Sequence, residues 1–169
     1  MEFRKSHKNF RELYIACKYV PASATGYALN CLNVTKKHIE ATDGRKAIRV
    51  KNLQELPVGK YRIVKCTKTL IDILPDANLD GIYPKFDDIF PLDDKGIFVD
   101  NLVYDDTVLK TLSILAYKLA RVETGIDITH AKPMADIQAE FEYFVIAPDR
   151  PIFFENPMAE AVIMPYNTK

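Results

Sequence analysis

Aspartates are the residues of this sequence best suited to chemistry, because several of them fall close together. The set is Asp87, Asp88, Asp93, Asp94, Asp100, Asp105 and Asp106. Two-metal nucleases use such clustered carboxylates to hold divalent cations for phosphodiester hydrolysis. Their ligands come from separate rigid elements, whereas most of these aspartates fall in one loop and one helix start. The spacing favours a solvated linker and leaves a carboxylate-dependent phosphodiesterase as the weaker alternative.

A second possible site combines His38, Glu40 and Asp43, which could meet around a pair of strands as a metal or acid/base site. Residues 38 and 40 alternate onto one face of a strand, and we expect that face to be exposed and solvated. The glycine patterns that cradle nucleotide phosphates are missing from the sequence. Serine and cysteine nucleophiles have no accompanying triad pattern. The prediction is a protein that is not an enzyme and needs no cofactor or metal.

The three cysteines, Cys17, Cys31 and Cys66, are far apart and odd in number. This spacing excludes a disulfide framework and an ordinary zinc module. Each has apolar neighbours in the sequence, so we predict buried, reduced thiols in preference to reactive ones.

The composition bounds the class of protein. The chain has 169 residues, of which 48% are hydrophobic and 27% are charged, which predicts one compact domain over residues 1–169. No apolar run approaches the roughly 18 residues that a membrane span needs, and the N-terminal residues do not form a signal peptide. We therefore expect a cytoplasmic protein without a membrane partner.

Charge is divided unevenly along the chain, although the formal net charge is zero. Residues 1–82 contain 15 Lys and Arg against 8 Asp and Glu, and residues 83–169 contain 8 against 15. This asymmetry indicates one region that faces a polyanion and one acidic region that faces solvent or a partner. Ordinary charge scatter is the simpler alternative.

The elements that must position these residues follow from periodicity. Residues 6–20 have helical spacing with one apolar and one mostly basic face, and Pro21 ends that helix. Strands are expected at 27–34, 38–42, 46–51 and 60–65, with a tight turn at Asp43-Gly44. A turn is expected around residues 23–26, and Thr67 is expected to cap a short helix that Pro75 stops.

The second half repeats this order after a loop-like linker at residues 75–96. A strand at 97–103 precedes a helix, with Asp105 and Asp106 at its N-terminus. Strands follow near 137–146, 151–154 and 159–164. The prediction is an α+β domain of two helix-plus-antiparallel-sheet half-units, about 1–82 and 95–169, which we call the first and second half-units.

Four segments resemble a known family in the family's own order. Ala41-Thr42-Asp43-Gly44 is similar to the Ala-Thr-Asp-Gly turn of bacterial sliding clamps, the DNA polymerase III beta subunit. Residues 61–74 resemble the family's next strand and leucine-rich helix, and residues 83–91 resemble its interdomain linker. Pro151-Ile152 and Val162-Ile163-Met164-Pro165 resemble its C-terminal signature. The resemblance implies a DNA-clamp-like domain, reduced here to a single one.

The resemblance also implies two surfaces. The first is an apolar pocket for a short peptide of polymerases and other clamp-binding proteins. Its positions would be Thr42, Gly44, Ala47, Pro84, Ile89, Val162, Ile163, Met164 and Pro165. The second is a helix surface that holds duplex DNA without reading its sequence. Its candidates are Arg4, Lys8, Arg11, Lys18, Lys110, Lys118 and Arg121.

The sequence departs from the family in charge and in length. Arg45 and Lys46 stand where the family usually has His and Arg, Asp87 and Asp88 replace a basic pair, and Tyr166 stands where Met is common. The resemblance implies that a ring would need about six copies, a homo-oligomer joined head to tail. The resemblance implies a processivity or recruitment factor for DNA replication. The alternative is an adaptor or competitor that forms no ring and keeps only the peptide pocket.

Overall fold

The computed structural model describes residues 1–21, 29–79, 82–90 and 96–165. The expected turn at 23–26, the start of the expected strand at 27–34, Asp93, Asp94 and Tyr166 lie outside these residues. Within the described ranges, no helix is both long enough and apolar enough to cross a membrane.

All strands of the described chain join one antiparallel sheet in the order β1-β6-β5-β2-β3-β4-β10-β9-β8-β7. The first half-unit supplies β1 (Glu2–Arg4), β2 (Leu32–Val34), β3 (His38–Thr42), β4 (Lys46–Lys51), β5 (Gly59–Cys66) and β6 (Leu70–Pro75). The second supplies β7 (Ile97–Leu102), β8 (Phe141–Val145), β9 (Ile152–Asn156) and β10 (Ala159–Ile163). Strands β4 and β10 pair from Ala159↔Val50 to Ile163↔Lys46, so this ladder joins the half-units.

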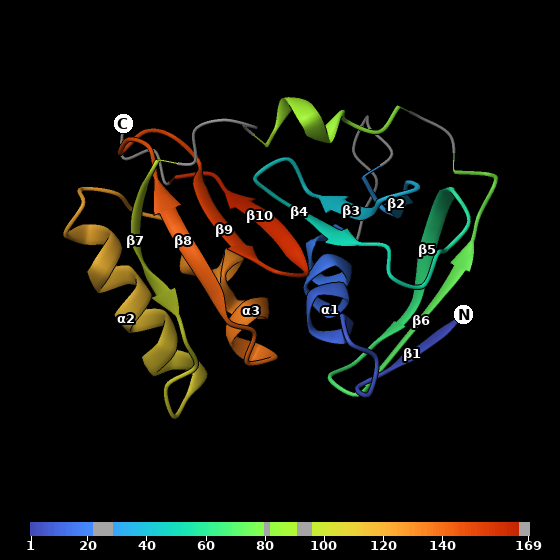
Figure 1. The fold of residues 1–169 in the computed structure, drawn as a ribbon, viewed down its shortest axis with the longest axis horizontal. Coiled ribbons are helices and arrows are strands. Elements are labelled where there is room, and N and C mark those ends of the chain that lie inside the picture. Colours follow the sequence, from blue (N-terminus) through green and yellow to red (C-terminus); the bar gives the residue numbers. More distant parts are fainter. Residues whose placement is uncertain (22–28, 80–81, 91–95, 166–169) are drawn as a thin grey trace.

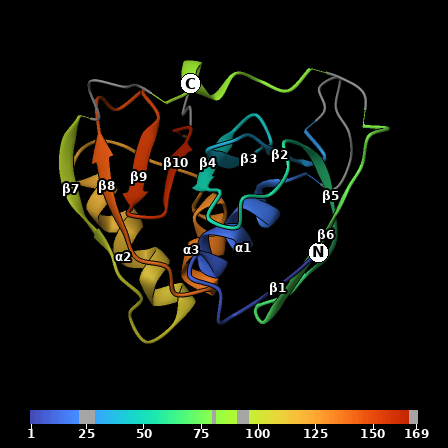
Figure 2. The same ribbon diagram turned by 45° about the vertical axis from the view of Figure 1, so that its right-hand side comes forward.

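Helices lie on one face of the sheet, which curves around them (Figures 1 and 2). They are α1 (Phe10–Tyr19), α2 (Val108–Ala120) and the short α3 (Lys132–Asp136), with a 3-10 turn η2 (Ile128–His130) before α3. We call this side of the sheet the helix face and the opposite side the outer face. The segment 82–90, which contains the 3-10 turn η1 (Phe86–Asp88), runs along the outer face.

The main core fills the space between the helices and the helix face. Alternate residues of the central strands point into it, such as Ile48 and Val50 of β4 and Ala161 and Ile163 of β10. Helix α1 packs against β3, β4 and α3, and eight of its ten residues are buried. The exposed residues of α1 are Arg11 and Lys18, both basic as expected, and they form a narrow strip because the rest of the helix is buried.

Two local predictions fail at identifiable residues. The short helix expected after Thr67 is strand β6, whose Ile71 and Ile73 are buried while Asp72 between them is less so. This alternation has the two-residue period of a strand, and β6 pairs with both β5 and β1. The strand expected to start near residue 137 begins at Phe141 and is preceded by α3, which has Pro133 in its first turn.

Candidate functional site

The turn Thr42-Asp43-Gly44 is stabilised by its own side chains. The Thr42 hydroxyl donates to the Lys46 carbonyl oxygen at 2.8 Å and accepts from the Gly44 N–H at 3.0 Å. The Asp43 carboxylate accepts from the N–H groups of Arg45 at 2.9 Å and Lys46 at 3.0 Å. Gly44 has φ of 89°, a conformation that favours glycine. The residue types of this motif are therefore explained by turn geometry, without a ligand.

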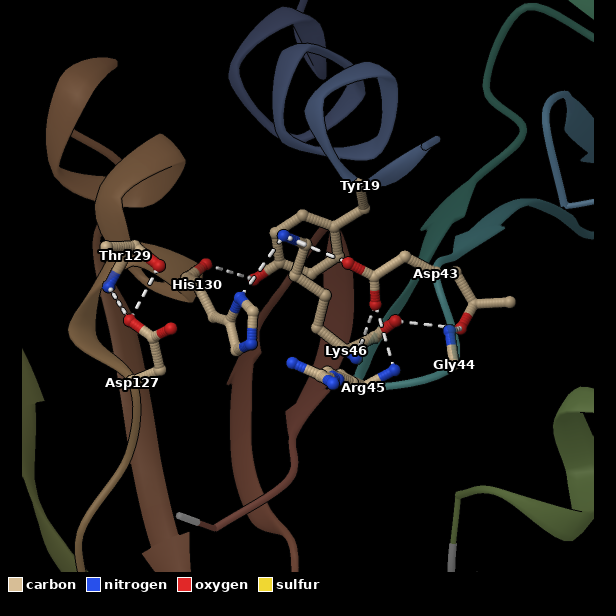
Figure 3. Close-up of polar contacts among 9 residues, drawn as sticks. Tyr19, Asp43, Gly44, Arg45, Lys46, Asp127, Thr129 and His130 are labelled. Carbon is tan, nitrogen blue, oxygen red and sulfur yellow. Dashed lines mark hydrogen bonds and ion pairs between the residues drawn. The ribbon is translucent and has the colours of Figure 1, made fainter. Parts of the chain in front are cut away.

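A cluster of polar side chains ties this turn to the second half-unit (Figure 3). We call Tyr19, Asp43, Lys46 and His130 the Lys46 cluster. The Lys46 ammonium lies 3.2 Å from Asp43 Oδ2 and 3.3 Å from His130 Nδ1. It also lies 5.2 Å from the centre of the Tyr19 ring, a cation–π contact. The Tyr19 hydroxyl donates to the His130 carbonyl oxygen at 3.1 Å.

The protonation states in the Lys46 cluster follow from these contacts. Because an ammonium group can only donate, His130 Nδ1 accepts and the ring is neutral. Burial lowers the pKa of His130, and the charge of Lys46 lowers it further. Burial raises the pKa of Tyr19, so its hydroxyl stays protonated and keeps its donor role. Sequence reasoning missed this cluster because its members lie far apart in the chain.

The turn η2 that presents His130 begins at a side-chain cap. Asp127 Oδ1 accepts from the Thr129 N–H at 3.0 Å and from the Thr129 hydroxyl at 2.6 Å. These hydrogen bonds stabilise the charged carboxylate and lower the pKa of Asp127. Aspartate two residues before threonine is a sequence pattern of such turns, and it could have indicated this feature.

A small second core lies on the outer face beneath the segment 82–90. We call it the outer cluster; its buried members are Ala47, Phe86, Phe90, Phe153 and Val162. The rings of Phe86 and Phe90 stack with their centres 5.7 Å apart. The segment 82–90 is therefore packed onto the sheet and covers strands of both half-units.

Arg49 of β4 anchors the linker to the sheet. Its guanidinium contacts the Glu160 carboxylate through Nε and Nη2 at 2.5 Å each, and Asp87 through Nη1 at 3.5 Å. It also stacks over the Phe90 ring at 4.6 Å from the ring centre. Its side chain is only 12% exposed. Asp87 of the linker segment therefore has a cationic partner on the sheet.

The residues expected to form a peptide pocket fall into three groups. Ala47, Val162 and the partly buried Ile89 meet in the outer cluster. The second group is exposed or half-buried and consists of Gly44, Pro84, Met164 and Pro165. Within it, the Met164 N–H donates to the Arg45 carbonyl oxygen at 2.8 Å. Thr42 is buried within its turn, and Ile163 faces the main core, on the opposite side of the sheet from Val162.

A row of polar residues crosses the outer face. In register order the row is Asn101, Glu142, Glu155, Glu160, Arg49, Glu40, Asn33 and Lys60. A cavity of about 470 Å³ lies at its acidic end, between Asn101 and Pro157, with Glu140, Glu142 and Glu155 in its lining. Glu142, Glu155 and Glu160 are cross-strand neighbours, so this part of the outer face repels anions.

Glu40 of the possible acid/base site belongs to this row, and His38 lies two residues before it on β3. Burial raises the pKa of Glu40, which accepts a hydrogen bond from Asn33 at 2.7 Å. Burial, followed by the charge of Arg49, lowers the pKa of His38. Asp43 is directed into the Lys46 cluster, away from both. The three candidates therefore do not converge.

Three of the aspartates that suggested a nuclease each meet a separate cation. Asp87 contacts Arg49, Asp100 contacts Lys118, and Asp105 lies 2.9 Å from Lys110. Among the described residues, no three His, Cys, Asp or Glu side chains are placed to hold a metal ion together. Helix α2 is capped by Thr107, which accepts from the Lys110 N–H at 3.1 Å, and Asp105 and Asp106 directly precede this cap as expected.

The candidate DNA-contacting residues differ in whether their charged groups already have a partner within the protein. Lys8 and Arg121 are exposed, and Arg4 in β1 is exposed with Glu2 at 3.8 Å. Arg11 and Lys18 are exposed and donate to backbone carbonyls of Gln138 at 3.0 Å and Cys66 at 3.4 Å. Lys110 and Lys118 form the ion pairs named above, so the second helix presents less net positive charge than its sequence indicates.

The comparisons with known proteins concern the fold. No protein-family model matches the sequence, and no curated protein matches it either. Solved structures do match, and they are bacterial clamps. The DNA polymerase sliding clamp of Pseudomonas aeruginosa superposes with a TM-score of 0.56 at 12% identity, over 99% of this chain and 66% of that chain.

Two further clamps agree. The DNA polymerase III beta subunit of Borrelia burgdorferi gives a TM-score of 0.58 at 13% identity, over 100% of this chain and 65% of that chain. The beta sliding clamp of Caulobacter crescentus gives 0.60 at 12% identity, with 99% and 65% covered. The chain thus spans about two thirds of the length of the clamps it matches. It has the α+β fold of the bacterial DNA polymerase III beta sliding clamps.

Proposed function

We propose that this chain is a sliding-clamp-like protein that binds duplex DNA non-specifically and recruits a DNA polymerase or other clamp-binding protein. The fold shared with the sliding clamps is the observation that carries this proposal. The chemistry of such a protein is binding alone.

The charges of the two sheet faces support one orientation on DNA. The outer face bears the row of glutamates, which repels phosphate, while Lys8, Arg11 and Lys18 are exposed on or next to α1. Duplex DNA would therefore lie against the helix face. Long flexible cations at this surface suit contact with phosphates and carry no sequence readout.

The outer cluster supports a peptide site at its exposed rim. Met164 is 45% exposed next to the Thr42-Asp43-Gly44 turn, and the partly buried Ile89 lies at the outer cluster. An apolar peptide side chain would pack on Met164 and Pro165 beside Gly44. The buried residues Ala47 and Val162 would support this surface from below.

Assembly into a ring would use the two ends of the sheet. Strand β7 is one edge and leaves Ile97 76% exposed, with Leu109 of α2 72% exposed. The other end is formed by β1 and β6. A second copy would pair these unlike ends, head to tail.

A salt titration of duplex binding tests the proposal. We expect fluorescence anisotropy with a labelled duplex to give affinity that falls steeply with salt, without sequence preference. The double variant Lys8→Glu, Arg11→Glu should weaken binding and lower the slope of log K against log salt by about 2, because each phosphate contact contributes about 1.

The matched control reverses a charge on the other face. Lys85→Glu lies in the linker over the outer face, is exposed, and should leave duplex affinity unchanged. If the control and the double variant weaken binding equally, or if the native protein binds no duplex at low salt, the DNA-binding part of the proposal is wrong.

The ion pairs of Lys110 and Lys118 favour a second candidate function. With these cations neutralised, the chain would act as an adaptor or competitor that keeps the peptide site and encircles nothing. Binding of a synthetic clamp-binding peptide by a stable monomer that has no affinity for duplex would select this candidate.

A further inference from the structure

Two thiols from different layers of the fold meet between α1 and the sheet. Cys17 is buried within α1, and Cys66, the last residue of β5, is half-buried against the same core. The two side chains hydrogen bond to each other. The third thiol, Cys31, is buried elsewhere, in surroundings charged by Lys60 and Asp76.

The surroundings make the two sulfurs unequal. The Lys18 ammonium donates to the Cys66 carbonyl oxygen at 3.4 Å and lies 5.3 Å from the centre of the Tyr14 ring. The hydrogen bond from Cys17 and the charge of Lys18 lower the pKa of Cys66. The same contact and burial raise the pKa of Cys17. Cys66 is thus the thiol that ionises and meets solvent, and Cys17 is the protonated thiol behind it.

We propose that Cys17 and Cys66 are a redox modification site, which a small-molecule disulfide such as glutathione disulfide converts into an intramolecular disulfide. The Cys66 thiolate attacks one sulfur of glutathione disulfide, forms a mixed disulfide and releases one glutathione thiolate. The Cys17 sulfur then attacks Cys66 Sγ and displaces the second glutathione, while its proton passes to a glutathione thiolate. Two protein thiols are oxidised, and one glutathione disulfide is reduced to two glutathione molecules.

The new bond would join the helix layer to the end of β5. It would close a loop that contains β2, β3, β4 and most of β5, and so restrict the unfolded chain. The Lys68–Asp136 ion pair, at 3.6 Å, already joins the β5–β6 turn to α3 in the same region. Little movement of the two layers is needed, because α1 packs against β5 and Lys18, next to Cys17, already reaches the Cys66 carbonyl oxygen.

Mass spectrometry of the folded, full-length protein tests the proposal. Reduced protein is incubated with glutathione disulfide, quenched with N-ethylmaleimide and digested without reductant. We expect a peptide pair linked through Cys17 and Cys66, Cys31 blocked by maleimide only after unfolding, and a melting temperature raised by roughly 10 °C over the reduced form.

Single substitutions separate the role of Cys66, which attacks glutathione disulfide, from that of Cys17, which resolves the mixed disulfide. Cys17→Ala should accumulate the glutathione adduct on Cys66, Cys66→Ala should leave Cys17 unmodified, and Cys31→Ala should form the disulfide as the native chain does. A stable glutathione adduct on native Cys66, a link to Cys31, or unmodified thiols would each overturn the proposal. If Cys17→Ala does not fold, the peptide map of the native chain decides by itself.

Discussion

At the scale of single residues, His130 gives the contact between the half-units a dependence on pH. Its Nδ1 accepts from Lys46, so a proton on that nitrogen would remove the acceptor and place two cations together. Arg45 adds positive charge from the same turn, while Asp43 and Asp127 oppose it. The folded pKa of His130 is lowered, so the unfolded chain binds more protons.

We therefore expect stability to be complete above the unfolded histidine pKa of about 6.5 and to fall as the pH drops toward the folded value. His130→Gln keeps an acceptor that does not titrate. It should reduce the slope of the unfolding free energy against pH by an amount equivalent to somewhat less than one bound proton. Urea unfolding between about pH 5 and pH 8 measures the slope.

The control is His7→Gln, because His7 is exposed and lies outside the Lys46 cluster. It should keep the slope of the native chain. An unchanged slope in His130→Gln would contradict the assignment of a neutral, accepting ring. His38, whose pKa is also lowered, contributes in the same direction and is present in all these proteins.

The residue scale also marks a limit of sequence reasoning. The Thr42-Asp43-Gly44 turn was predictable because its hydrogen bonds join residues at most four apart. The Lys46 cluster was not, since Lys46 and His130 are 84 residues apart. The role of Asp87 was hidden for the same reason, because its partner Arg49 comes from another element.

At the scale of elements, edge strand β7 depends on how it begins. Gly96 precedes it with φ of 84°, and a Cβ there would lie 2.5 Å from the Val145 carbonyl oxygen. That oxygen is part of the backbone of β8, which cannot yield as a flexible side chain could. Glycine at this position therefore lets β7 approach β8.

Gly96→Ala should consequently destabilise the protein by about 3 kcal/mol, through strain at positive φ and displacement of β7. Gly125→Ala is the matched control, because a Cβ there has no atom within 4 Å and Gly125 has no positive φ. Its effect should stay within about 0.5 kcal/mol. Urea unfolding compares the two, and equal losses would contradict the role given to Gly96.

Elements were predictable where their period was clear. The strands around the Asp43-Gly44 turn and the helix that contains Leu112, Leu115 and Leu119 have unambiguous spacing. Residues 70–74 were ambiguous, since five residues with Leu and Ile at both ends fit a helical turn or a strand. These residues form strand β6 because they pair with β1 and β5 on either side, and such pairing cannot be recognised from the local sequence.

At the scale of the molecule, the two ends of the sheet are unlike, and this distinguishes head-to-tail assembly from a symmetric dimer. Strand β7 ends the sheet on the side of the acidic half-unit, while β1 and β6 end it on the side of the basic one. Because the ends differ and the half-units carry opposite net charge, contact is favoured between the β7 end of one copy and the β6 end of the next.

Variants blocked at one end each test this arrangement. Ile97→Lys at the β7 end and Leu74→Asp at the β6 end should each remain monomeric by light scattering, because each puts a charge into a contact. Mixed together, they should form a dimer and nothing larger, since each retains one intact end of the opposite kind. In a symmetric β7 to β7 dimer, Leu74→Asp alone would dimerise and mixing would add nothing. That result, or a native chain that stays monomeric, would contradict the ring. The adaptor that forms no ring would then be the remaining candidate function.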